Sequence, residues 1–253
     1  MDDHPGNDDH HTVGQTVRLA YFHQDSTAFQ NAIGHPMVLN REARGVQSLI
    51  FTAIHQGRLN FLRMMVQNPG FDVNKRVMHA VGAGGEMDTP LGAACRRGNI
   101  HIVRILIESG ANPAVTNRYG DTALHIAARL VSGPWFHEAV SEVMNDRMCS
   151  IIRILVEKDV SLIDQLNYAR MSPVHLVAQR GPREMIALML RKGARVDCVS
   201  GGPPYQTSTL EWIRARFPDM VHLVDHSGLF PRNDNPRRLY HQAVLSIVQS
   251  SLV

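Results

Sequence analysis

Residues Asp88–Pro113, DTPLGAACRRGNIHIVRILIESGANP, are the stretch of sequence that decides the fold. Thr89 and Pro90 predict a helix start, because a proline at the first helical position loses no N–H donor that the helix needs. Gly98 predicts a turn, and Gly110 stands where a helix typically ends in a left-handed conformation. The second helix is apolar around most of its circumference, at Ile102, Val103, Ile105, Leu106 and Ile107. Because a single unit cannot bury that surface, the stretch predicts neighbouring copies of itself.

Further copies of this unit occur on both sides of it. Residues 122–129 read TALHIAAR, residues 172–181 read SPVHLVAQRG, and residues 48–57 read SLIFTAIHQG. The shared pattern is T-P-L-x-x-A-A-x-x-G, followed by I-V-x-x-L-L and a closing G-A, and it resembles the ankyrin repeat. The distance of 33 residues from Thr89 to Thr122 agrees with the period of that family.

The resemblance implies an all-α solenoid of helix-turn-helix repeats joined by β-turn fingers and capped at both ends. We expect a disordered tail over residues 1–14, a repeat domain over 15–227, and a linker with a short C-terminal helix over 228–253. The repeat domain is expected to hold an N-terminal cap at 15–46, repeats starting near 48, 89, 122 and 172, and a degenerate cap at 207–227.

Two segments depart from the regular repeat length. The finger after the first repeat is longer and contains GAGG at 82–85, but it lacks the spacing of a phosphate-binding loop, so a finger tip is expected there. The third repeat has sixteen extra residues between its helices, among them Trp135 and Phe136. This insertion is expected to extend the second helix or to add a short helix before it. Its aromatic side chains either pack on the outer side of the array or form a partner-binding knob.

Composition narrows the class of protein. The 253 residues, 44% of them hydrophobic, suffice for one globular domain or a short repeat array. The net charge of +3 is too small to indicate a nucleic-acid partner. The cysteines Cys95, Cys149 and Cys198 form no C-x-x-C pair, which argues against a zinc site and a disulfide framework. We therefore expect no cofactor and no metal, and we interpret Cys95 as a buried free thiol.

The sequence also bears on location. The N-terminal residues MDDHPGNDDHH lack the apolar region of a signal peptide. No run approaches the roughly 18 apolar residues of a membrane span. We therefore expect an intracellular protein, cytoplasmic and/or nuclear, with no membrane association.

The polar residues form no catalytic motif such as H-E-x-x-H or G-x-S-x-G, so the chain is not expected to be an enzyme. His125 and His175 occupy the histidine position of the repeat motif. The resemblance implies a structural role for both, because this side chain forms hydrogen bonds in the finger region of ankyrin repeats.

The resemblance implies that the chain binds another protein in a concave groove lined by the fingers and the first helices. Ten residues at the variable positions of that groove are expected to contact the partner: Arg96, Arg97, Arg118, Tyr119, Asp121, Arg129, Tyr168, Arg170, Met171 and Arg180. Most of them are arginines, so the expected partner is an acidic protein segment.

Three other functions stay open at this point. Ankyrin arrays also serve as substrate adaptors of ubiquitin ligases, although the residues after Pro236 lack the Leu-Cys-Arg start of the box that usually accompanies this role. An enzyme with a loop-borne site is the less favoured alternative. The C-terminal residues Ser251-Leu252-Val253 resemble a ligand of PDZ domains, which bind a chain end as an added strand.

Overall fold

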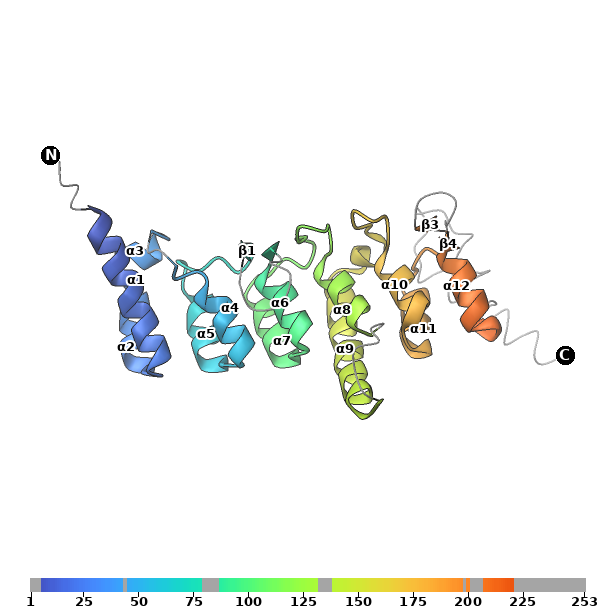
Figure 1. Ribbon diagram of the computed structural model, residues 1–253, viewed down its shortest axis with the longest axis horizontal. Coiled ribbons are helices and arrows are strands. Elements are labelled where there is room, and N and C mark those ends of the chain that lie inside the picture. Colours follow the sequence, from blue (N-terminus) through green and yellow to red (C-terminus); the bar gives the residue numbers. More distant parts are fainter. Residues whose placement is uncertain are drawn as a thin grey trace.

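The computed structural model describes residues 6–42, 45–78, 87–131, 138–197, 199–200 and 207–220. Pairs of helices stand side by side in chain order, and the loops that join successive pairs gather on one side of the row (Figure 1). The predicted all-α solenoid is confirmed. The helices of the described residues are α1 Gly6–Phe22, α2 Ser26–Ile33, α3 Pro36–Leu39, α4 Leu49–Gln56, α5 Leu59–Gln67, α6 Pro90–Arg97, α7 Ile100–Glu108, α8 Ala123–Val131, α9 Glu138–Lys158, η1 Val160–Asp164, α10 Pro173–Arg180, α11 Arg183–Arg191, α12 Thr209–Arg216 and η2 Pro218–Met220.

The central unit, α6 with α7, shows how the sequence specifies these helices. The Thr89 hydroxyl accepts a hydrogen bond from the Gly92 N–H at 3.1 Å, and Pro90 occupies the first turn of α6. Gly98 ends α6 with φ +65°, and Gly110 follows α7 with φ +87°. Both glycines adopt the left-handed conformation, which was predicted for Gly110 and which side chains with a Cβ disfavour.

The core is continuous from the first cap to α12, because the apolar faces of adjacent helix pairs bury one another. Leu106 of α7 and Leu155 of α9 are both fully buried, as the alignment of their repeats predicts. Cys95 is a buried free cysteine, also as predicted, and burial raises the pKa of its thiol. Each helix pair therefore depends on its neighbours for its core, as in other repeat arrays.

Two short antiparallel ladders lie in the fingers. Strand β1 (Val77–Met78) pairs with β2 (Met87–Asp88) in the finger between the first and second repeats. Strand β3 (Val199–Ser200) pairs with β4 (Thr207–Ser208) before α12. The GAGG run at 82–85 lies outside the described residues.

The N-terminal cap begins earlier than predicted. Helix α1 starts at Gly6, so the predicted disordered tail over 1–14 is wrong from residue 6 onward. Val13 packs against the core and Val17 is fully buried, so two apolar residues one helical turn apart hold this part of α1 on the array. Residues 221–253, and with them the predicted linker, C-terminal helix and PDZ ligand, lie outside the described part of the chain.

The insertion in the third repeat lengthens the second helix, which is the first of the two predicted outcomes. Helix α9 has 21 residues, and it projects beyond the neighbouring helices (Figure 1). Met148 is fully buried, and a Cβ added at Gly98 would lie 2.8 Å from its methyl group. The middle of α9 is thus packed on the turn of the preceding repeat. Trp135 and Phe136 lie outside the described residues, so the choice between packing and a partner-binding knob stays a prediction.

Candidate partner-binding site

A buried carboxylate organises the surface between the second and third repeats. Asp88 is fully buried at the end of β2. Its Oδ2 accepts hydrogen bonds from Nε of Arg96 at 3.2 Å and from Nη2 of the same side chain at 2.9 Å. Its Oδ1 accepts from the side-chain amide of Asn117, in the next finger, at 3.3 Å. One side chain therefore holds its own first helix and the finger of the following repeat together.

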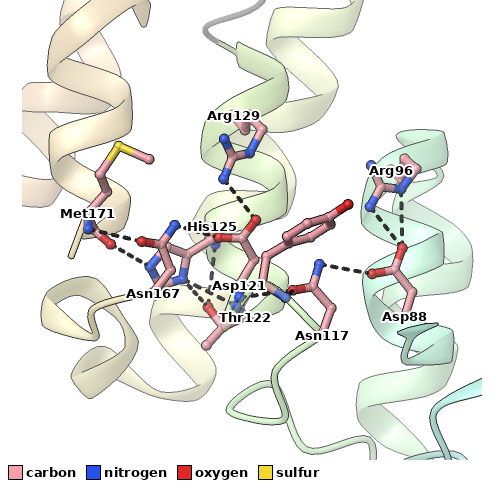
Figure 2. Close-up of polar contacts among 10 residues, drawn as sticks. Asp88, Arg96, Asn117, Asp121, Thr122, His125, Arg129, Asn167 and Met171 are labelled. Atoms are coloured by element: carbon pink, nitrogen blue, oxygen red, sulfur yellow. Dashed lines mark hydrogen bonds and ion pairs between the residues drawn. The ribbon is translucent and has the colours of Figure 1, made fainter. Parts of the chain in front are cut away.

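The third repeat reproduces this arrangement (Figure 2). Asp121 has 4% of its surface exposed, and its Oδ2 accepts from Nη2 of Arg129 at 2.8 Å. Its Oδ1 accepts from the side-chain amide of Asn167, in the finger of the fourth repeat, at 2.7 Å. We call these two units, Asp88 with Arg96 and Asp121 with Arg129, the Asp–Arg pairs.

The pattern stops at the fourth repeat. Met171 and Gln179 occupy the positions that the aspartate and the arginine have in the two preceding repeats. The Met171 side chain is half-buried and packs against the core. The second and third repeats therefore carry a charged pair at this position, whereas the fourth repeat carries an apolar side chain.

The buried side chain of His125 forms a hydrogen bond to the finger that contains Met171. The Nε2 of His125 lies 3.0 Å from the Met171 carbonyl oxygen and donates to it, while its Nδ1 accepts from the backbone N–H and the hydroxyl of Thr122. Desolvation lowers the pKa of His125 more than Asp121 raises it, and Arg129 acts in the same direction as burial. The predicted structural role of this histidine is confirmed. His175 is also buried, with its Nδ1 3.1 Å from the Thr209 hydroxyl, and burial lowers its pKa too.

Acidification is expected to destabilise the fold through His125 and His175. Their folded-state pKa values lie below the ordinary value of 6.5, so the unfolded chain binds protons more readily as the pH falls through that value. The free energy of unfolding should therefore fall as the pH is lowered from 7.5 to 5.5. Urea unfolding of His125→Gln should show a smaller loss over this range than the native chain. His101→Gln, which changes an exposed residue of α7, is the control, and an equal loss in all three chains would contradict the expectation.

A depression with a volume of about 570 Å³ lies beside the Asp–Arg pairs. It takes residues from α6, from α8, and from the fingers at 117–121 and 167–171. Seven of the ten residues predicted to contact a partner line it: Arg96, Arg118, Tyr119, Asp121, Arg129, Tyr168 and Met171. The structure therefore brings together most of the residues that the sequence analysis selected.

The remaining predicted residues lie apart from the depression or carry a different role. Arg97 donates to the His55 carbonyl oxygen at 3.2 Å and so links the second repeat to the first. Arg170 is exposed with φ +57°, and the side chain of Arg180 is outside the described residues. Asp121 lines the depression but has a different role from the one expected, because its largely buried carboxylate is paired with Arg129.

The sequence analysis missed the residues that build the site from within. Asp88, Asn117 and Asn167 are not among the ten residues expected from the sequence to contact a partner. The sequence does contain a pattern that could have identified these residues. Arg96 and Arg129 each follow an aspartate by eight residues, and Asn117 and Asn167 stand equally far before the first helix of the repeat that follows each of them. The Asn117 Oδ1 also accepts from the backbone N–H of Tyr119 at 2.9 Å, which shapes the finger.

Two kinds of site are absent from the described residues. Within them, no group of three or more His, Cys, Asp or Glu side chains is arranged to hold a metal ion. None of the helices in the described ranges is long and apolar enough to cross a bilayer. The chemistry available at the depression is therefore that of guanidinium groups, phenol rings and apolar side chains.

Comparison with known proteins shows which family the repeats resemble. Residues 49–134 match the family model described as ankyrin repeats in three copies. The helix pairs of the structure extend the same architecture through α10 and α11, beyond the matched residues. Over residues 49–134 the chain is similar to ankyrin repeats, in agreement with its fold.

Individual relatives are similar to part of this chain. The homolog of transient receptor potential cation channel subfamily A member 1 from Caenorhabditis elegans is 30% identical over 149 residues, which are 55% of this chain and 12% of that protein. Phosphocholine transferase AnkX from Legionella pneumophila is 28% identical over 62% of this chain and 15% of its own length. Mouse cyclin-dependent kinase 4 inhibitor B is 27% identical over 45% of this chain and 75% of its own. The chain thus spans only a small part of the first two relatives.

Proposed function

We propose that this chain is a non-enzymatic adaptor that binds a segment of a partner protein along its finger side. The observation that carries the proposal is the depression, because three consecutive repeats contribute residues to it. A bound segment would contact several repeats at once, and their rigid stacking keeps the contact residues in place without a large entropic cost. Arginine and tyrosine, which predominate among the exposed lining residues, are the side chains that most often anchor protein interfaces.

An acidic partner segment fits the charges of this surface. Three guanidinium groups line the depression, those of Arg96, Arg118 and Arg129. The two neighbouring carboxylates, Asp88 and Asp121, are buried. The charge that a partner meets is therefore mainly positive, which favours carboxylates and speeds association with them.

Site-specific photocrosslinking tests the proposal. A benzophenone amino acid replaces Tyr168, whose ring is 77% exposed, and in the control chain it replaces Arg104, which is exposed on the outer face of α7. Irradiation in a lysate should give a discrete adduct from the Tyr168 position only. Mass spectrometry of the adduct should identify one peptide segment of the partner. The same adducts from both positions, or none from the Tyr168 position, would contradict the proposal.

The crosslinked segment then tests the charge argument. Arg97→Glu combined with Arg118→Glu should weaken binding of that segment, mainly by slowing association, and high salt should reduce the difference. Arg191→Glu combined with Lys192→Glu, at the end of α11, is the control with the same change of charge. Equal losses from both double variants would show that recognition does not depend on the charge of the finger side.

A further inference from the structure

We propose that the depression beside Met171 is an anchor pocket for one bulky apolar side chain of the partner segment, and that an adjacent carboxylate of that segment pairs with Arg129. This inference rests on the proposed function and specifies which segments the site accepts. It requires only one ion pair with the partner, because the Asp–Arg pairs already occupy part of the arginine donors.

The floor of the pocket is apolar as a consequence of the sequence. Asp88 and Asp121 carry a carboxylate at this place in their repeats, whereas the fourth repeat has Met171. Beside it lie Leu130, which is half-buried, and Ile126, which is 4% exposed. A polar or charged group placed on this floor would lose water without finding a partner there, whereas an apolar side chain gains from burial.

The walls of the pocket are two exposed tyrosines that the fold holds in place. Tyr119 is 42% exposed and Tyr168 is 77% exposed, which is unusual for such large side chains. The backbone N–H of Tyr168 donates to the Tyr119 carbonyl oxygen at 3.1 Å. The Arg118 guanidinium lies 4.7 Å from the centroid of the Tyr119 ring. Arg118 therefore steadies the Tyr119 ring, and the backbone hydrogen bond joins the two fingers, which reduces the conformational entropy lost on binding.

Gly120 explains why the Tyr168 wall can form. A Cβ at this position would lie 2.8 Å from Cδ1 of Tyr168 and 2.9 Å from its backbone nitrogen. The Tyr168 ring thus rests directly on the glycine between the two fingers. Its other face is available to a ligand, because most of the side chain is exposed.

The charged edge of the pocket comes from Arg129. Its guanidinium has five N–H donors, and in the described residues Nη2 meets Asp121 at 2.8 Å. The side chain is 49% exposed, so donors that do not point at Asp121 are accessible to a ligand carboxylate. Arg96, in contrast, turns both Nε and Nη2 toward Asp88. The arrangement therefore favours one acidic residue next to the anchor over a long acidic run.

The size of the pocket agrees with a single anchor. Its volume of about 570 Å³ lies within the range of roughly 300–1,000 Å³ typical of ligand pockets. Such a space holds one aromatic or long aliphatic side chain together with the neighbouring backbone. Central, desolvated anchors of this kind carry most of the binding energy of protein interfaces.

Selection of displayed random peptides on the folded full-length chain tests the inference. The enriched peptides should combine a bulky apolar residue with a nearby Asp or Glu, and their affinity is then measured by fluorescence polarisation. Met171→Asp, which restores the carboxylate of the preceding repeats, and Tyr168→Ala should each weaken the selected peptides about tenfold or more. Leu166→Ala is the matched control, because Leu166 is 47% exposed on the same loop and does not line the pocket. Thermal melts of all three variants check that the fold is intact.

A double-mutant cycle tests the carboxylate. Changing the acidic residue of a selected peptide to its amide should weaken binding to the native chain, and should matter much less in Arg129→Gln. Acidic peptides without an apolar anchor, bound equally by the native chain and Met171→Asp, would overturn the anchor pocket and leave the adaptor function intact. Peptides with the expected motif whose affinity survives Tyr168→Ala would also overturn it. No enriched peptide together with no photoadduct from position 168 would reject both proposals.

Discussion

Replacing Leu106 with alanine is expected to lower the free energy of unfolding by roughly 2–5 kcal/mol. Leu106 is fully buried in α7, which packs between the second helices of the first and third repeats. The truncation loses the transfer free energy of the removed methyl groups and leaves a cavity that the rigid neighbours fill only in part. Because each repeat depends on its neighbours, the damage should spread to both sides of the array.

Urea unfolding followed by circular dichroism measures this loss. The matched control is Arg104→Ala, which truncates an exposed side chain of the same helix. It should change the free energy of unfolding by no more than about 0.5 kcal/mol. The control also separates the loss of a buried side chain from any effect of alanine on the helix itself. A Leu106→Ala chain that unfolds at the same urea concentration as the native chain would show that α7 is not part of a shared core.

The architecture could be predicted because it depends on local signals that recur. Thr89 and Pro90 at a helix start, and Gly98 and Gly110 at helix ends, act over a few residues and keep their meaning in every repeat. The lengthened α9 followed from the sixteen-residue excess in an otherwise regular register. The start of α1 could not be predicted from composition, since Asp and His residues suggested disorder. The contacts of Val13 and Val17 with the core outweigh that tendency.

The site was predictable only in part, because its contacts join residues that lie far apart in the sequence. The variable positions of the repeats led to Arg129, Tyr119 and Tyr168, which do line the depression. Which polar residues are buried depends on how adjacent fingers meet. The Asp121 carboxylate accepts a hydrogen bond from Asn167, 46 positions later in the sequence. The residues next to Asp121 in the sequence therefore could not show that it is a buried structural residue and not a contact residue.

Removing the Asp121 carboxylate should weaken the coupling between the third and fourth repeats, so that they unfold less cooperatively. In Asp121→Ala, the half-exposed Arg129 can turn to water, but the buried side-chain amide of Asn167 loses its acceptor. A buried donor left without a partner costs about 1–3 kcal/mol. The loss falls on the contact between α8 and the finger before α10, so the unfolding transition should broaden or divide into two steps.

Asp121→Asn distinguishes the two parts of this contact. The amide keeps one oxygen that can accept from Asn167, but it loses the charge and presents an NH₂ group to its neighbours. Its free energy of unfolding should therefore lie between those of the native chain and Asp121→Ala. Glu108→Ala is the control, since it removes an acidic side chain of the same charge from an exposed position at the end of α7. Urea unfolding of the four chains gives the comparison. If Asp121→Ala unfolds in one step and loses no more stability than Glu108→Ala, the buried carboxylate does not couple the repeats, and the Asp–Arg pairs serve only the surface.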